Sequence, residues 1–304
     1  MAVAAAPQVQ TQGPGYYRIM VGDFEVTALL DGTHAFPIDT VVEGMSGKEI
    51  EANLARDFLT PPVQGSINAF LINTGSKLVL IDAGAGDLYG ACCGHLADNI
   101  RAAGYRPEQV DQILLTHMHK DHIGGVSAKG TMLFPNAVLR ASKAEADYWL
   151  NAANKAKAPP FLGSFFDAAI AAAAPYQSAN RFEPFEGDVE LAPGIVSMQT
   201  PGHTPGHVSY VVRSQGQMLI VWGDLVHVAA LQLQKPDTTV KYDSNAASAR
   251  HSRKDVFGEV VRDRSVVAAA HIAFPGLGHL RRQGNRFEWV PVNYEAEPGK
   301  PGGH

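Results

Sequence analysis

The chain has 304 residues, of which 45% are hydrophobic, and it carries a formal net charge of −5 with a sequence pI of about 6.2. No stretch approaches the roughly 18 consecutive apolar residues of a membrane-spanning helix, so the sequence predicts no membrane span. Lysine and arginine are mostly scattered, which argues against a groove for nucleic acid.

The chain begins Met-Ala-Val-Ala-Ala-Ala-Pro, and residues 1–14 are expected to form a flexible tail. This start is too short for a complete export signal, but it is typical of the small-residue end of a cleaved one behind a new methionine. We therefore expect a periplasmic or secreted protein, with a cytoplasmic location as the alternative. At the other end, residues 296–304 are rich in Pro and Gly and are expected to be disordered.

Between residues 15 and 295, short apolar runs alternate with turn signals, and no Ser/Gly-rich linker divides them. The apolar runs predict strands over 23–29, 69–73, 77–81, 112–115, 210–212, 218–222 and 266–270, with a hairpin turn at 74–76. Helices are predicted over about 96–103, ending at Gly104, in one or two pieces over 143–174 with a break at Pro159-Pro160, and over 246–262. A single catalytic α/β domain made of two similar lobes is the simplest interpretation.

The segment 116–125 reads THMHKDHIGG and directly follows the strand predicted at 112–115. Side chains two apart in an extended segment point the same way, so the first two histidines should face one point. If the chain then turns at the Asp-His pair, with the two glycines relieving the backbone, that pair can face a second point nearby. One loop would thus hold two metal ions, the alternative being a solvated polar loop rich in histidine. The candidate ligands are His117, His119, Asp121 and His122.

Further ligands are expected at the ends of other strands. Pro and Gly surround His203 and His207, which excludes a helical i, i+4 pair and leaves one as a ligand and the other as a structural histidine. Asp224 follows the strand at 218–222, and a carboxylate can bridge two cations. For the last ligand, His271 ends a buried strand and His279 lies in a Gly-flanked loop; the strand end gives the more rigid position.

Asp82 directly follows the strand predicted at 77–81, and we expect it to accept a hydrogen bond from a ligand imidazole and fix its tautomer. The adjacent Cys92 and Cys93 are poorly placed for a relaxed disulfide and are expected to be buried thiols. Four other histidines have no comparable context and are expected to be exposed or simply packed: His34, His95, His227 and His251.

In their order along the chain, these features resemble the metallo-β-lactamase superfamily, and within it the methyl parathion hydrolase group and its lactonase relatives. The resemblance rests on the segments 14–18, 73–80, 116–122, 203–207 and 268–276. It implies a four-layer αββα sandwich with the metals at one edge of the two sheets, and a homodimer.

The resemblance also implies a ligand set. One metal would take His117, His119 and His203, the other Asp121, His122 and His271, with Asp224 as the bridge. True β-lactamases of this fold commonly carry a cysteine in place of Asp224, which argues against β-lactam hydrolysis.

The sequence has no Gly-x-Ser-x-Gly segment, so we expect a hydroxide held between two divalent metals to attack the substrate. In this scheme Asp224 bridges the metals and Asp121 orients the hydroxide or takes up its proton. Zinc is the expected metal, and cobalt, manganese or iron would suit the same N/O ligands.

The expected substrates are small neutral lactones or aryl esters, and organophosphate triesters are a second or even the main class. An apolar pocket wall supports this expectation, although the same residues could instead be helix core: Trp149, Phe165, Phe166 and Leu231. The alternatives are a dedicated organophosphate hydrolase, a persulfide dioxygenase with one iron, and a non-catalytic binding protein of the same fold.

Overall fold

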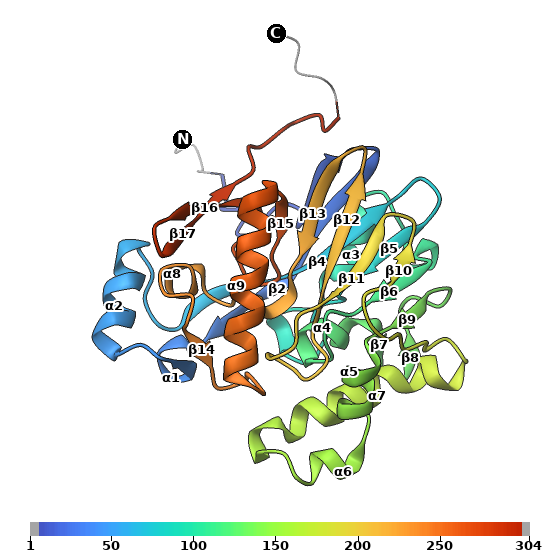
Figure 1. Cartoon of the computed structure of the whole chain (residues 1–304). Coiled ribbons are helices and arrows are strands. Elements are labelled where there is room, and N and C mark those ends of the chain that lie inside the picture. The colour runs from blue at the N-terminus through green and yellow to red at the C-terminus, as the bar shows by residue number, and fades with distance from the viewer. Residues whose placement is uncertain (1–5, 300–304) are drawn as a thin grey trace, which may run out of the picture.

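The computed structural model describes residues 6–299 and contains two mixed β-sheets that lie face to face with helices outside them (Figure 1). The first sheet has the strand order β1-β2-β4-β5-β6-β9 and the second β10-β11-β12-β13-β15-β16-β17. The expected αββα sandwich is therefore confirmed. No helix within residues 6–299 is long and apolar enough to cross a membrane.

The strands of the first sheet are β1 Tyr16–Val21, β2 Phe24–Phe36, β4 Val63–Asn73, β5 Leu78–Ile81, β6 Gln112–Leu114 and β9 Val138–Arg140. Those of the second are β10 Glu190–Ala192, β11 Ile195–Gln199, β12 Val208–Ser214, β13 Gln217–Val221, β15 Val266–Ala268, β16 Leu277–Gln283 and β17 Arg286–Pro291. Two small sheets pair β3 Val42–Glu43 with β14 Thr239–Val240, and β7 Ser127–Ala128 with β8 Thr131–Met132.

The α-helices are α1 Ile38–Val41, α2 Gly47–Arg56, α3 Leu96–Ala102, α4 Lys120–Ile123, α5 Lys143–Trp149, α6 Ala152–Lys155, α7 Gly163–Ser178, α8 Ala229–Gln232 and α9 Ala246–Asp263. Short 3₁₀ turns lie at Gly90–Cys92, Pro107–Gln109, Gly124–Val126, Pro160–Leu162 and Gly223–Leu225. Residues 6–14 and 296–299 contain neither helix nor strand, and the remaining residues of the two predicted tails lie outside the described residues.

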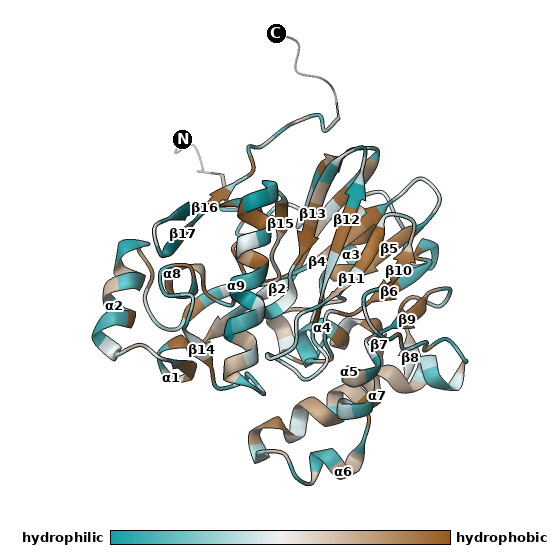
Figure 2. Ribbon diagram, viewed as in Figure 1, coloured by the Kyte–Doolittle hydropathy of each residue, from teal (hydrophilic) through white to brown (hydrophobic). Residues whose placement is uncertain are grey.

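Alternation along the strands explains the layers. On β5, Leu80 faces a core shared with α3 and α7, whereas Val79 faces the core between the two sheets. On β13, Leu219 faces the core between the sheets, whereas Ile220 faces α9. Because both faces of each sheet are covered, the central strands are apolar throughout, and Figure 2 shows them mostly brown while α9 is banded in teal and brown.

The helical region after residue 143 is more broken than the sequence predicted. Three α-helices replace one or two, because Asn151 caps a new helix by accepting a hydrogen bond from the Ala153 N–H, in addition to the break at the prolines. The last helix also continues to Ser178, with Pro175 inside it. The cysteines are both free, but only Cys93 is buried; Cys92 is partly exposed.

Two pairs of parallel strands place functional side chains at one edge of the sandwich. β5 runs parallel to β6, with Ile81 opposite Leu114, and β13 runs parallel to β15, with Val221 opposite Ala268. The carboxyl ends of parallel strands coincide, so the loops that leave these strands emerge together. That edge holds the predicted metal ligands.

Candidate metal centre

Seven buried side chains gather in two groups at this edge. The first group is His117, His119, His203 and Asp224, and the second is Asp121, His122 and His271. Within each group, the candidate ligand atoms lie within 4.8 Å of one another. The structure therefore brings together every side chain that the sequence proposed as a ligand.

The first group joins the loop after β6 to loops of the second sheet. Nδ1 of His119 lies 3.0 Å from Nε2 of His203, which in turn lies 3.2 Å from Oδ2 of Asp224. Nε2 of His117 is 3.6 Å from the same Oδ2. Three imidazole nitrogens and a carboxylate oxygen thus converge, which is a donor set suited to zinc.

The second group faces the other oxygen of the same carboxylate. Oδ1 of Asp224 lies 3.1 Å from Nε2 of His122 and 3.1 Å from Nε2 of His271. Oδ2 of Asp121 lies 3.6 Å from the His271 nitrogen. Asp224 therefore directs one oxygen to each group, as a bridging ligand would.

Buried polar atoms without partners test whether metal ions fit here. Among residues 6–299, Nε2 of His117, Nε2 of His122, Nε2 of His271 and Oδ1 of Asp224 are buried and have no hydrogen-bond partner. Leaving such atoms unpaired costs free energy, and here they point toward shared centres. Two divalent cations would satisfy all four atoms, so the residues fit a dinuclear site.

Asp82 orients His122, as the sequence predicted. Its Oδ2 accepts from Nδ1 of His122 at 2.9 Å, which leaves Nε2 free for a metal. Thr116 holds the carboxylate in place through its N–H and its hydroxyl, both at 2.8 Å. Asp82 has φ = 59°, an unusual conformation for a non-glycine residue and one often found at functional sites.

A second orienting carboxylate, Asp243, was not predicted. Its Oδ1 accepts from Nδ1 of His203 at 2.8 Å, and its Oδ2 accepts from the Val240 N–H at 3.0 Å. Although burial opposes the shift, the carboxylates of Asp224 and Asp243 raise the pKa of His203 to about 9. Asp243 follows the two-residue strand β14, which has no clear sequence signal.

Asp243→Ala is expected to weaken metal binding by roughly 10- to 100-fold, because His203 loses the partner that fixes its tautomer and ring orientation. Competition with a chromogenic zinc chelator measures this affinity. Asp237→Ala is the matched control, since it removes an equal charge from an exposed side chain that pairs with Lys254. Equal affinities in the two variants would contradict the orienting role.

His207 is the structural partner in the pair of histidines. Its Nε2 accepts from the backbone N–H of Asp224 at 3.0 Å, and its Nδ1 donates to the carbonyl of Thr200 at 3.1 Å. Burial lowers the pKa of His207 to about 3, so the ring stays neutral and can accept. His207 thus holds the backbone of Asp224 instead of facing either group.

The electrostatics favour an ionised bridge. Burial alone would raise the pKa of Asp224, but the surrounding imidazoles, His122 foremost, hold it well below its usual range. Burial lowers the pKa of His117 and of His119 well below 6.5. A charged carboxylate between neutral imidazoles is the protonation state that metal ligands require.

Glu145, which the sequence did not suggest, clamps the two loops that carry the first group. This fully buried carboxylate on α5 accepts from the N–H of Met118 and from the N–H of Gly206, each at 2.9 Å. Burial raises its pKa, and the backbone hydrogen bonds oppose that shift. A Cβ at Gly206 would lie 2.2 Å from the Glu145 nitrogen, so only glycine allows this approach.

The glycines after His122 are needed for close packing. Their expected role was to relieve the backbone, but Gly124 has φ = −57° and ψ = −36°, which any residue adopts. A Cβ at Gly124 would lie 2.2 Å from the Ala85 carbonyl oxygen, and one at Gly125 would lie 1.9 Å from that of Ala83. The loop after β5 therefore packs directly against the metal-binding loop.

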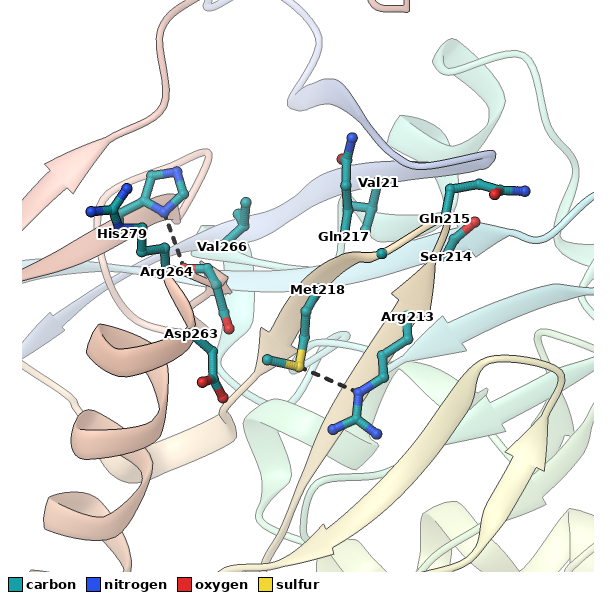
Figure 3. Close-up of a pocket in the computed structure, with 12 residues that line it drawn as sticks. Val21, Arg213, Ser214, Gln215, Gln217, Met218, Asp263, Arg264, Val266 and His279 are labelled. Atoms are coloured by element: carbon teal, nitrogen blue, oxygen red, sulfur yellow. Dashed lines mark hydrogen bonds between the residues drawn. The ribbon is translucent and has the colours of Figure 1, made fainter.

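His279 lies away from both groups. It lines a hollow of about 810 Å³ near the amino-terminal ends of β13 and β15, and its Nδ1 bonds the carbonyl of Ser265 at 3.1 Å (Figure 3). The metal groups lie at the carboxyl ends of the same strands. His271 rather than His279 is therefore the histidine at the candidate metal centre.

The metal groups open into a narrow chamber of about 60 Å³, which we call the inner chamber. It is lined by His34, Phe36, Pro37, Tyr89, His119, Asp121, Phe165, His203, Asp224, His227 and Tyr242. His227 was expected to be an ordinary histidine, yet its Nε2 lies 3.1 Å from Oδ2 of Asp224 and its ring stacks on His271. The tyrosines and His34 also were not predicted.

The predicted pocket wall needs correction. Phe165 lines the inner chamber, but Trp149, Phe166 and Leu231 do not. Trp149 and Phe166 pack into the core around α7, where the Trp149 ring supports His119 at 5.0 Å. Leu231 belongs to a separate cluster with α1 and α2. These three apolar side chains face cores because their helices turn them away from the chamber.

Comparisons with known proteins agree with this geometry. A family model described as the metallo-beta-lactamase superfamily matches residues 62–271. The crystal structure of hydrolase AbOPH, of the beta lactamase superfamily, is 36% identical with a TM-score of 0.88, covering 94% of this chain and 100% of that chain. AidC, a dizinc quorum-quenching lactonase in complex with a product, is 27% identical with a TM-score of 0.85, covering 92% of this chain and 98% of its own.

An N-acyl homoserine lactonase of Bacillus cereus is 28% identical over 122 residues, which is 40% of this chain and 40% of that protein. The match therefore spans about two fifths of the length of this curated relative.

Proposed function

The chain belongs to the metallo-beta-lactamase superfamily, and from this premise we propose that it is a dinuclear metal-dependent hydrolase of small lactones or aryl esters. One observation carries the proposal: a single buried carboxylate, Asp224, directs its two oxygens to two groups of unpartnered ligand atoms. This arrangement suits two cations held side by side above a chamber that substrate can enter.

The proposed ligands are His117, His119 and His203 for one ion and Asp121, His122 and His271 for the other, with Asp224 shared. When bound, two divalent cations would supply a polarised substrate carbonyl and a water of lowered pKa. Zinc is the proposed metal, as in AidC, which is a dizinc enzyme. Cobalt, manganese or iron would suit the same ligands.

The surrounding side chains would position the substrate and move protons. Asp121 lines the inner chamber, so its Oδ2 can accept the proton of the attacking water. Burial, with Asp121 and Asp224 adding to it, raises the pKa of Tyr89, so its hydroxyl stays protonated and can donate to a substrate oxygen. The aromatic walls Phe36, Phe165 and Tyr242 suit a neutral, compact reacting group.

Lactones are proposed ahead of phosphotriesters because AidC and the Bacillus cereus relative are lactonases. The test is kcat/KM for dihydrocoumarin and for methyl paraoxon on metal-loaded protein, each with and without chelator. We expect hydrolysis of the lactone to exceed that of the triester by on the order of 10²-fold, a ratio that pocket fit can produce.

Chelation should abolish this activity, and added zinc should restore it. The reverse preference would identify an organophosphate hydrolase instead. No hydrolysis of either compound by protein with two bound metals would contradict the proposed function.

A further inference from the structure

The inner chamber leads into a second, wider space of about 460 Å³, which we call the outer chamber. His34, Tyr89, Phe165 and Tyr242 line both spaces and so form the neck between them. Since the inner chamber measures only about 60 Å³, it can admit little more than the reacting group. The part of the substrate remote from the scissile bond must therefore lie in the outer chamber.

Two lysines give the outer chamber its charge. Lys120 and Lys241 both line it, together with Val41, Phe161 and Ser164. Neither ammonium lies within 4 Å of a carboxylate in the part of the chain that the structure describes, whereas several other lysines are paired in this way. The chamber thus presents two positive charges that no carboxylate of residues 6–299 neutralises at close range.

Lys120 is held at the neck. Its Nζ lies 4.7 Å from the centre of the Phe165 ring and 5.2 Å from that of the Tyr89 ring, both of which are neck residues. Such cation–π contacts restrict the side chain without neutralising its charge. Lys241 is anchored through its backbone, whose N–H donates to the Val41 carbonyl at 2.9 Å.

We propose that the outer chamber selects lactones and esters whose remote part carries a carboxylate or a similar small anion, bound by Lys120 and Lys241. The inference rests on the proposed function, and it narrows the substrate class, because the reacting group remains neutral while the remote group is anionic. Ammonium groups bind carboxylates through charge-assisted hydrogen bonds, which a neutral remote group cannot match. A purely hydrophobic substrate would leave both lysines without a partner.

The test compares substrates that differ only in the remote charge. Dihydrocoumarins with a carboxylate at each free ring carbon in turn are paired with the corresponding carboxamides, and kcat/KM is measured on zinc-loaded protein. For at least one position, we expect the carboxylate to be favoured about tenfold, as expected for two partly exposed ion pairs. The preference should appear mainly in KM and should shrink as salt is raised, because salt screens exposed charges.

The variants use the ratio of the two kcat/KM values, so a general change in activity cancels. Lys120→Met and Lys241→Met are each expected to lower the ratio about threefold, and the double variant should bring it to about one. Lys241→Arg should retain the preference. Lys129→Met makes the same change in net charge at an exposed turn outside both chambers and should leave the ratio unchanged.

Two outcomes would overturn the inference, and they can be told apart. If the carboxamides are hydrolysed but no carboxylate is favoured in the wild-type protein, the proposed lactonase function stands and the anion preference is wrong. If neither series is hydrolysed by protein with two bound metals, the proposed function fails, and the inference fails with it.

Discussion

Asp224→Ala is expected to remove both metals and to lower kcat/KM by on the order of 10³-fold, the size of loss seen when a single charge-stabilising group leaves an active site. The reason is geometric: its two oxygens face the two ligand groups separately, so one substitution takes a ligand from each. Metal content by mass spectrometry and kcat/KM on the same sample measure the effect.

His119→Ala provides the comparison, because His119 belongs to the first group alone. This variant is expected to retain part of its metal while also losing activity. Circular dichroism should show that both variants keep their secondary structure. Near-normal turnover of Asp224→Ala would be incompatible with a dinuclear centre.

Glu145→Ala is expected to have the largest effect on stability, lowering the free energy of unfolding by about 3–5 kcal/mol. The substitution leaves the buried N–H groups of Met118 and Gly206 without an acceptor and creates a cavity beneath both loops. Denaturant unfolding of the metal-free protein measures this loss. Metal affinity should fall as well, since the loops carrying His117, His119 and His203 lose their common anchor.

Asp147→Ala is the matched control on the same helix, because Asp147 is exposed and pairs only with Lys143 at the surface. It should cost less than about 1 kcal/mol. Glu145→Gln should fall between the two, since the amide can accept one of the hydrogen bonds but presents its NH₂ to the other N–H. A Glu145→Ala protein as stable as the Asp147→Ala protein would contradict the clamp.

The sequence predicted the ligands well because their signal is local. The spacing within 116–122 and the positions of Asp224 and His271 after apolar runs follow directly from strand geometry. The supporting side chains have no such signal. Asp243 and Glu145 act on loops that approach them only in the folded chain, so nothing in their neighbouring residues indicates their role.

The pocket could not be predicted for a related reason. Trp149, Phe165 and Phe166 are close in sequence and similarly apolar, yet only Phe165 reaches the chamber. Which aromatic side chain points outward depends on how α5 and α7 pack against the first sheet. The lysines of the outer chamber come from segments 121 residues apart, 241 minus 120, and their meeting at one space is a property of the tertiary fold.

Each proposed metal site takes side chains from both sheets: the loop after β6 supplies some, and the loops after β11, β13 and β15 supply the others. Bound cations would therefore cross-link the two halves of the sandwich, and ions that bind only the folded state stabilise it by mass action. At a free metal concentration of 100 times the dissociation constant, this linkage contributes about 2.7 kcal/mol per site. The melting temperature of the protein should then rise and fall with the metal supply around it.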